Sequence, residues 1–179
     1  EPVKIVKPFE FVPNQLNEGF KAPYDVQYVA LCGNFKKAGL PYTGALQVFQ
    51  NAVSTDYLWK NVRVLGGAYG CSCGFRGTGE AFFVSYRDPN LTKTLDVYHE
   101  VVKYIEEFNA TEEEMIKYII GAVGSFDFPL SPANKGVRSL GAYFNGKTVD
   151  DYKLEKQQII DATVEDIKNV FDKLGIPEA

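Results

Sequence analysis

The chain has 179 residues, the length of one ordinary domain, and a chain of this length buries about 70% of the surface that its unfolded form exposes. Its composition, with 45% hydrophobic and 23% charged residues, is that of a globular protein, and no apolar run approaches the roughly 18 residues that a membrane span requires. The net charge of −4 provides no basic field for a phosphate backbone, so we expect neither a membrane nor a nucleic acid as a partner.

The first 23 residues contain four prolines and little hydrophobic periodicity, which is typical of an extended linker. We therefore expect residues 1–23 to be a linker or N-terminal extension and residues 24–179 to form a single domain. The chain begins at Glu1, without a methionine or a signal-type segment. We interpret it as a piece of a longer polypeptide in which another domain precedes the linker.

A strand and a long helix are predicted next. Residues 25–32 are rich in strand-forming side chains and alternate on the face that carries Val26 and Cys32, which predicts a strand. From residue 43 to residue 61, apolar side chains recur at three- and four-residue spacing, which predicts an amphipathic helix. The apolar face of this helix consists of Leu46, Phe49, Val53 and Tyr57. Arg63 then lies where the helix ends.

A turn and a hairpin follow the helix. The Gly66–Gly67 pair turns the chain into a second strand, which is predicted at residues 68–76. A glycine-containing connection at residues 77–79 leads into a third strand at residues 81–86, and this pattern predicts a β-hairpin. The Asp-Pro-Asn segment at residues 88–90 ends the third strand.

The remainder of the chain is predicted to be helical. Apolar residues at helical spacing indicate one helix that runs to about Phe108, and they are Leu95, Tyr98, Val102, Ile105 and Phe108. Three later helices begin with recognisable caps, which are Thr111 with Glu114 in a capping box, Ser131 before Pro132, and Thr163 before the last helix. The inward side chains of that last helix are Ile167, Val170, Phe171 and Leu174. Because this order lacks the regular strand–helix alternation of a parallel fold, we predict an α+β fold, with a mostly antiparallel sheet packed against helices on one face.

Residues Gly141 to Thr148 match the phosphate-binding pattern G-x-x-x-x-G-K-[ST], but their context argues against nucleotide binding. A phosphate loop needs a buried strand before it and a helix directly after it, so that backbone amides converge on the phosphates. The residues before Gly141 do not form a buried strand, and the two aspartates after Thr148 would place carboxylates beside the anion. We interpret the segment as a helix that ends near Phe144, with Gly146 as its C-terminal stop.

No set of metal ligands stands out in the sequence. Cys71 and Cys73 are two apart in a predicted strand and would share one face, but Cys-x-x-Cys spacing and a second ligand pair are missing. We interpret both as small packing residues. The single histidine, His99, shares a helical stripe with charged residues and is expected at the surface. With Cys32 the cysteines number three, which favours a reducing compartment.

The segment from Arg63 to Tyr69 places a guanidinium and a phenol six positions apart around the Gly66–Gly67 break. Alternate small residues from Ala68 to Gly74 leave one strand face nearly bare, so that another backbone or a bound peptide can approach closely. In one interpretation the segment is tight helix-to-sheet packing, with Arg63 as an ion-paired surface residue and Tyr69 at the edge of the core. In the other, Arg63 and Tyr69 both donate to a carbonyl oxygen or an oxyanion. The spacing alone leaves both interpretations open.

Five short motifs carry a family resemblance. They are Asp25-Val-Gln-Tyr-Val-Ala, Tyr57-Leu-Trp59, Arg63-Val-x-Gly-Gly-Ala-Tyr69-Gly, Ser85-Tyr-Arg-Asp-Pro-Asn90 and the following Thr-Leu-x-x-Tyr98. Together they resemble the C-terminal domain of presequence-protease-like peptidases, which belong to the pitrilysin/insulinase group of zinc peptidases. The resemblance extends over nearly the whole chain from about Gly19.

The resemblance implies a zinc metalloendopeptidase of four domains, whose two halves close around short, unfolded peptides. In that family zinc is held by an inverted His-x-x-Glu-His motif and a distal glutamate in the N-terminal domain, and none of these occurs here. Zinc is therefore expected as the cofactor of the full-length enzyme, whereas this chain alone is expected to hold no metal and to be inactive. By position in the motif, Arg63 and Tyr69 correspond to the pair that binds the substrate backbone across the closed chamber, with Gly66 and Gly67 between them.

The resemblance also implies the partners, which are the N-terminal catalytic domains of the same polypeptide and peptide substrates. Self-association of the isolated domain, through a surface that the other domains cover, is a further expectation. A cytoplasmic location in a bacterium is favoured, with an organellar matrix as the alternative. The second functional hypothesis is a catalytically silent scaffold domain of the same fold, and the intact pair of Arg63 and Tyr69 argues against it.

Overall fold

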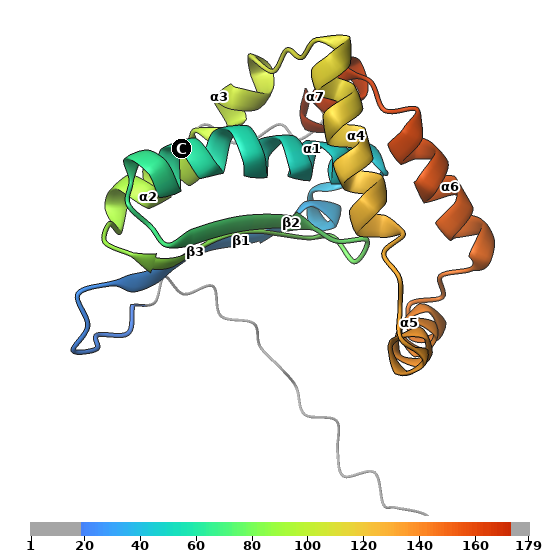
Figure 1. Cartoon of the computed structure of the whole chain (residues 1–179), viewed down its shortest axis with the longest axis horizontal. Helices are drawn as coiled ribbons and strands as arrows, with labels where there is room; N and C mark the ends of the chain where they lie inside the picture. Colours follow the sequence, from blue (N-terminus) through green and yellow to red (C-terminus); the bar gives the residue numbers. More distant parts are fainter. Residues whose placement is uncertain (1–18, 173–179) are drawn as a thin grey trace, which may run out of the picture.

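The structure is a computed structural model that describes residues 19–172 of the chain. Within these residues three strands form one antiparallel sheet in the spatial order β1-β3-β2, and a layer of helices covers one face of that sheet (Figure 1). The strands are β1 (Gln27–Asn34), β2 (Gly70–Phe75) and β3 (Glu80–Asp88). The helices are η1 (Phe35–Ala38), α1 (Ala45–Ala52), η2 (Val53–Leu65), α2 (Thr92–His99), α3 (Val101–Glu106), α4 (Glu112–Phe126), α5 (Pro132–Phe144), α6 (Val149–Ile160) and α7 (Val164–Asp172). The predicted α+β class is confirmed.

The sheet contains the predicted hairpin, in which β2 pairs antiparallel with β3 and Cys73 lies opposite Phe83. β1 pairs with the other side of β3. The face of β1 toward the helices carries Val29, which is 2% exposed, whereas Tyr28 on the opposite face is 71% exposed. The side chains that alternate on one face of the predicted strand, from Val26 to Cys32, therefore lie on the face of the sheet that points away from the helices. Because both faces of β1 carry apolar side chains, the alternation predicts a strand without showing which face is buried.

α1 and η2 form one continuous helix across the sheet, and η2 has the wider i→i+5 turns of a π-helix (Figure 1). The predicted helix is confirmed, but it extends to Leu65 instead of ending near residue 61. The wider turns also shift the buried face, because Val53 is followed inward by Leu58, five residues later. Tyr57, which was expected on the apolar face, is only half-buried, and its hydroxyl donates to a main-chain carbonyl of α2 at 2.8 Å.

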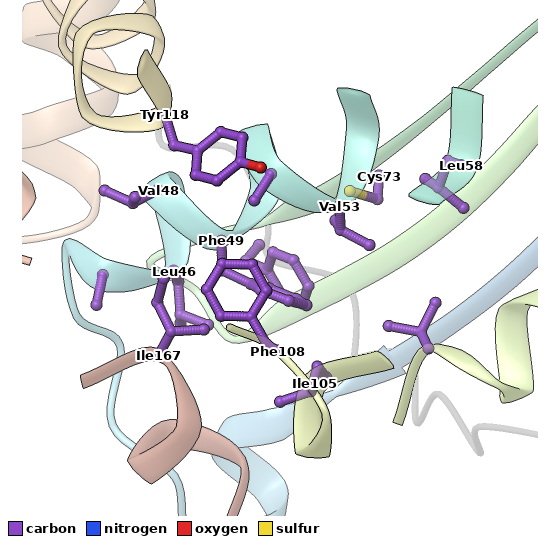
Figure 2. Close-up of a cluster of buried hydrophobic side chains, with 14 of the residues drawn as sticks. Leu46, Val48, Phe49, Val53, Leu58, Cys73, Ile105, Phe108, Tyr118 and Ile167 are labelled. Atoms are coloured by element: carbon purple, nitrogen blue, oxygen red, sulfur yellow. The ribbon is translucent and has the colours of Figure 1, made fainter. Parts of the chain in front are cut away.

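The core lies between the sheet and the helices and includes Phe49 of α1. The side chain of Phe49 is fully buried, and its ring centroid lies 5.6 Å from that of Phe75 on β2. Figure 2 shows side chains from distant parts of the chain gathered in this cluster. Those labelled with Phe49 are Leu46, Val48, Val53, Leu58, Cys73, Ile105, Phe108, Tyr118 and Ile167. The helices on both sides of the hairpin in the sequence therefore share one core.

The helix predicted to run to Phe108 is two helices in the structure, α2 and α3, which are separated at Glu100. Glu100 has ψ of −6°, which departs from the helical value and ends α2. The buried apolar residues of this region are Tyr98, Val101, Ile105 and Phe108. Val102, which was expected to be buried, is half-buried. The break at Glu100 shifts the buried face of the following helix by one residue, so that Val101 is buried instead.

The helix caps predicted from the sequence are confirmed. Thr111 and Glu114 form a capping box, in which the Glu114 amide donates to Thr111 Oγ1 at 3.3 Å. Ser131 caps α5 directly before Pro132. Thr163 accepts a hydrogen bond at 3.1 Å from the third residue of α7. Each cap satisfies amides that have no partner within the helix.

Some predictions reach beyond the described residues. Ile167 of α7 is fully buried, as predicted, but Leu174 and the side chains of Val170 and Phe171 lie outside the described part of the structure. The same holds for most of the linker predicted at residues 1–23. In the part of the chain from residue 19 to residue 172, no helix is both long enough and apolar enough to cross a membrane.

Gly44 allows the start of α1 to approach α6 closely. A Cβ atom at Gly44 would lie 2.5 Å from the carbonyl oxygen of Glu155 and 2.8 Å from the amide nitrogen of Ile159. The Gly44 amide also donates to the side chain of Gln158 at 2.9 Å. Because the closest contacts are with main-chain atoms, a side chain at this position would force the two helices apart.

Gly44→Ala is therefore expected to lower the free energy of unfolding by about 1–3 kcal/mol, the usual cost of extra atoms in a packed interface. Urea denaturation of the chain measures this change. Gly124 in α4 is the matched control, because nothing lies within 4 Å of a Cβ atom there. Gly124→Ala is expected to raise stability by up to about 1 kcal/mol through helix propensity. Equal effects of the two substitutions would contradict the close packing of α1 on α6.

Candidate functional site

Arg63 and Tyr69 lie on either side of the turn between η2 and β2. Arg63 is in the last turn of η2, and Tyr69 immediately precedes β2. The Nη1 atom of Arg63 donates to the main-chain carbonyl of Tyr69 at 2.8 Å, and the Gly67 amide donates to the Arg63 carbonyl at 2.9 Å. The structure thus brings the two residues together, with the side chain of one fixed on the backbone of the other.

Gly66 and Gly67 are both required by this turn, for different reasons. A Cβ atom at Gly66 would lie 2.5 Å from the carbonyl oxygen of Val62. Gly67 has φ of 79°, in the left-handed region that glycine adopts without steric cost. The break expected at these two positions is therefore the point where the chain reverses from the helix layer into the sheet.

The side chains of Arg63 and Tyr69 are held at the surface by aromatic contacts. The guanidinium carbon of Arg63 lies 4.2 Å from the ring centroid of Trp59 and 5.7 Å from that of Tyr69. Arg63 forms no ion pair with a described residue. Tyr69 is 62% exposed, and its ring meets that of Tyr86 edge-on. The packing interpretation, with an ion-paired Arg63 and a Tyr69 at the core edge, is wrong in both respects.

A buried carboxylate that the sequence analysis missed anchors the turn. Asp88, at the end of β3, is 0% exposed, and its Oδ1 and Oδ2 accept from the Asn90 amide at 2.8 Å and from Thr94 Oγ1 at 2.7 Å. The side chain of Asn90 in turn donates to the Gly66 carbonyl at 2.6 Å. In the sequence, residues 88–90 indicate only the end of a strand. The sequence signal that could have identified Asp88 is the Asx turn, in which an aspartate side chain accepts a hydrogen bond from the backbone amide two residues later.

The bare strand face that the small residues of β2 predict is only partly open. A Cβ atom at Gly74 would lie 2.5 Å from the ring of Phe82, so this ring covers one end of the face. Gly70 has nothing within 4 Å of a Cβ position, and Ser72 is exposed. β2 is also an edge strand of the described sheet. The open end, beside Tyr69, is thus the part that another backbone can approach.

The described residues do not fit a zinc site. Within residues 19–172, no group of three or more histidine, cysteine, aspartate or glutamate residues is arranged to hold a metal ion. Burial raises the pKa of Cys73 to about 12 and also raises the pKa of Cys71, so both thiols are protonated near neutral pH. Cys73 Sγ lies 3.3 Å from Ser54 Oγ, within the helix-facing side of β2. His99 is exposed at the end of α2.

The phosphate-binding pattern at residues 141–148 has a structural role instead. Gly146, with φ of 64°, stops α5 as predicted. Lys147 pairs with the buried carboxylate of Glu155 on α6, and Thr148 forms the capping box of α6. The segment joins two helices, whereas a phosphate loop follows a strand. The lysine and the threonine of the pattern are therefore both engaged within the fold.

Comparison with known proteins relates the whole described domain to one family. Residues 17–176 match the family model of the PreP C-terminal domain. Protein HypA from Clostridium perfringens is 44% identical over 161 residues, which are 90% of this chain and 16% of that protein. Presequence protease 1, chloroplastic/mitochondrial, from Arabidopsis thaliana is 35% identical over 161 residues, which are 89% of this chain and 15% of that protein. The chain thus spans about one sixth of the length of these curated relatives.

Solved structures share the fold at low sequence identity. The inactive peptidase domain of a proposed zinc protease from Bordetella parapertussis matches with a TM-score of 0.64 and 16% identity, over 80% of this chain and 81% of that one. A proposed zinc protease from Bordetella pertussis Tohama I matches with a TM-score of 0.61 and 17% identity, over 80% of this chain and 84% of that one. At these identities the likeness is one of fold.

Asn90→Ala is expected to lower the free energy of unfolding by about 1–2 kcal/mol, because the Gly66 carbonyl loses its donor in a partly buried position. Urea denaturation measures the change. Asn109→Ala is the control, since Asn109 is exposed, and its effect is expected to stay within about 0.5 kcal/mol. If the two variants are equally stable, Asn90 does not anchor the turn.

ATP with Mg²⁺ is expected to leave the Tm of the chain unchanged, because Lys147 and Thr148 are engaged in the fold. Thermal unfolding at rising nucleotide concentrations measures this. A Tm that climbs with ATP concentration would mean that the folded state binds the nucleotide, contrary to the structural role of the pattern.

Proposed function

This chain belongs to the PreP C-terminal domain family, and from that membership we propose that it is the substrate-binding, non-zinc-binding C-terminal domain of a zinc-dependent metallopeptidase that degrades short, unfolded peptides. The domain comprises residues 24–179, after a linker at residues 1–23. Arg63 is the charged donor and Tyr69 the neutral donor to a carbonyl of the peptide backbone, across a closed chamber. Gly66 and Gly67 shape the turn between the two donors.

The position of the Arg63 guanidinium carries the proposal. The Arg63 guanidinium has five N–H groups. One of them donates to the Tyr69 carbonyl at 2.8 Å, and the guanidinium carbon lies 4.2 Å from the centroid of the Trp59 ring. The other N–H groups and the Tyr69 hydroxyl have no acceptor among the described residues. Donors fixed before the substrate arrives stabilise negative charge on an oxygen without reorganisation, and the loss of one slows turnover about 100- to 1,000-fold.

The metal and the general base belong, in this proposal, to the N-terminal domains of the same polypeptide, where a bound zinc ion would supply Lewis-acid chemistry. The present chain then binds and orients a peptide but does not hydrolyse it alone. A bacterial cytoplasm is the proposed location and an organellar matrix the alternative, because relatives come from a bacterium and from chloroplasts or mitochondria.

The partner domains are proposed to cover the apolar side of α5. None of the residues of this helix is buried, and Val137, Leu140 and Tyr143 are 69%, 56% and 79% exposed. Their three-residue spacing places them on one stripe of the helix. In the isolated domain, the same stripe is the surface through which two copies associate.

A second function, that of a catalytically silent scaffold domain, is favoured by one observation. One structural neighbour is described as an inactive peptidase domain. In this case the chain binds partner domains and no substrate. The exposed pair of Arg63 and Tyr69 argues against it, because a scaffold needs neither an exposed phenol nor free guanidinium donors at this turn.

Arg63→Ala and Tyr69→Phe, each made in the full-length polypeptide that contains this chain, are expected to lower kcat for peptide cleavage by about one to three orders of magnitude. The reason is that each substitution removes a donor to the substrate carbonyl. Steady-state kinetics with a short peptide measures the loss, and metal analysis is expected to show an unchanged zinc content.

Two further variants control this experiment. Tyr24→Phe removes the hydroxyl of another exposed tyrosine, 77% exposed, and is expected to keep full activity. Arg63→Lys keeps the charge without the planar fork and is expected to restore only part of the rate. Peptide hydrolysis at the wild-type rate by both Arg63→Ala and Tyr69→Phe would sink the proposal and favour the scaffold function.

A further inference from the structure

A β-bulge in β3 places Arg87 beside the candidate site. Gln27 of β1 lies opposite Asp88 and Val29 opposite Ser85, so β3 has one extra residue in this interval. Among the non-glycine residues of the described chain, Arg87 alone has a positive φ, at 47°. A conformation of this kind costs free energy, and bulges often aim a side chain at a functional position.

The bulge sets the Arg87 side chain against a row of tyrosine rings. Its guanidinium carbon lies 5.3 Å from the ring centroid of Tyr86 and 5.9 Å from that of Tyr69. Tyr28 on β1 extends the row, with 5.2 Å between its ring centroid and that of Tyr86. Tyr28 and Tyr69 are 71% and 62% exposed, so the row is open to solvent. Ring contacts of this kind hold a guanidinium in place while leaving its edge free.

The guanidinium N–H groups of Arg87 have no acceptor among the described residues. Of the four arginines, Arg76 pairs with Glu80, Arg138 donates to a main-chain carbonyl and Arg63 donates to that of Tyr69. No such bond or ion pair joins the Arg87 guanidinium to a described residue, although the rings position it. A guanidinium in this state presents a planar fork of donors that matches a carboxylate.

Arg87 and Arg63 flank the same ring. Their guanidinium carbons lie 5.9 Å and 5.7 Å from the Tyr69 centroid, so the two are at most 11.6 Å apart. An extended peptide advances about 3.3 Å per residue, and it therefore covers this separation in about three or four residues. One peptide can contact both arginines.

We propose that Arg87, set against the rings of Tyr69 and Tyr86, binds a carboxylate of the peptide within about four residues of the carbonyl that Arg63 binds. The carboxylate is an aspartate or glutamate side chain, or the C-terminus of the peptide. Arg87 is then a specificity-determining residue of the domain. This inference rests on the proposed function, because it assigns a second contact to the peptide held at Arg63.

The test uses the full-length polypeptide and two pairs of labelled peptides. In the first pair a glutamate within four residues of the cleaved bond is replaced by glutamine, and in the second the C-terminal carboxylate is replaced by an amide. Wild-type protein is expected to prefer the carboxylate member of one pair by about tenfold in kcat/KM, the effect of one charge-assisted hydrogen bond. Arg87→Gln is expected to bring that ratio close to one, whereas Arg76→Gln, at an exposed arginine in the β2–β3 connection, is expected to keep it.

The pair that shows the preference identifies the source of the carboxylate. A ratio near one for both pairs in the wild type, or a ratio that Arg87→Gln leaves intact, overturns the inference.

Equilibrium binding of the same peptides in the presence of a chelator, where nothing is cleaved, keeps the test independent of the Arg63 result. Loss of catalysis in Arg63→Ala with no carboxylate preference in binding would refute the role of Arg87 alone. A carboxylate preference with full activity in Arg63→Ala would refute the assigned role of Arg63 and retain the carboxylate contact.

Discussion

The buried carboxylate of Asp88 joins the parts of the fold on which the candidate site depends. It lies at the end of the central strand with no exposed surface and accepts hydrogen bonds from the Asn90 amide and from Thr94 at the start of α2. A polar group is stable in such a place only when hydrogen bonds replace the water that it has lost. Through the Asn90 side chain the same anchor reaches the Gly66 carbonyl. The sheet, α2 and the turn after η2 are thereby tied at one point.

Rigid placement of this kind is what a pair of donors needs. Arg63 is on the last turn of a long helix and Tyr69 is at the first residue before a strand, so neither depends on a flexible loop. The hydrogen bond from Arg63 to the Tyr69 carbonyl joins the two ends of the turn, and the Trp59 ring packs against the guanidinium. The side chains are therefore positioned before any peptide arrives, which is the condition for electrostatic stabilisation of a reacting carbonyl.

Features that depend on neighbouring residues could be predicted from the sequence, and features that depend on distant pairing could not. The caps at Thr111 and Ser131 were predicted because a cap involves only one turn of helix. The same holds for the Gly66–Gly67 turn between the site residues. The buried face of β1 was not predictable, because it is decided by the helices that pack there. Arg87 was missed for a similar reason: its bulge exists only in the pairing of β3 with β1.

The π-helical turns of η2 make the number of residues in this helix part of the site. Each residue of a helix adds a rotation of roughly 100°, so removing one residue between Val53 and Arg63 without a compensating change in the winding would turn the following side chains to another side. The guanidinium would then leave the turn that it closes, although every motif residue was still present. A related chain with one residue fewer in this helix can therefore have every residue of the motif and still lack this arrangement of the site. Alignment across residues 53–65 must therefore match the length of the helix as well as its residues.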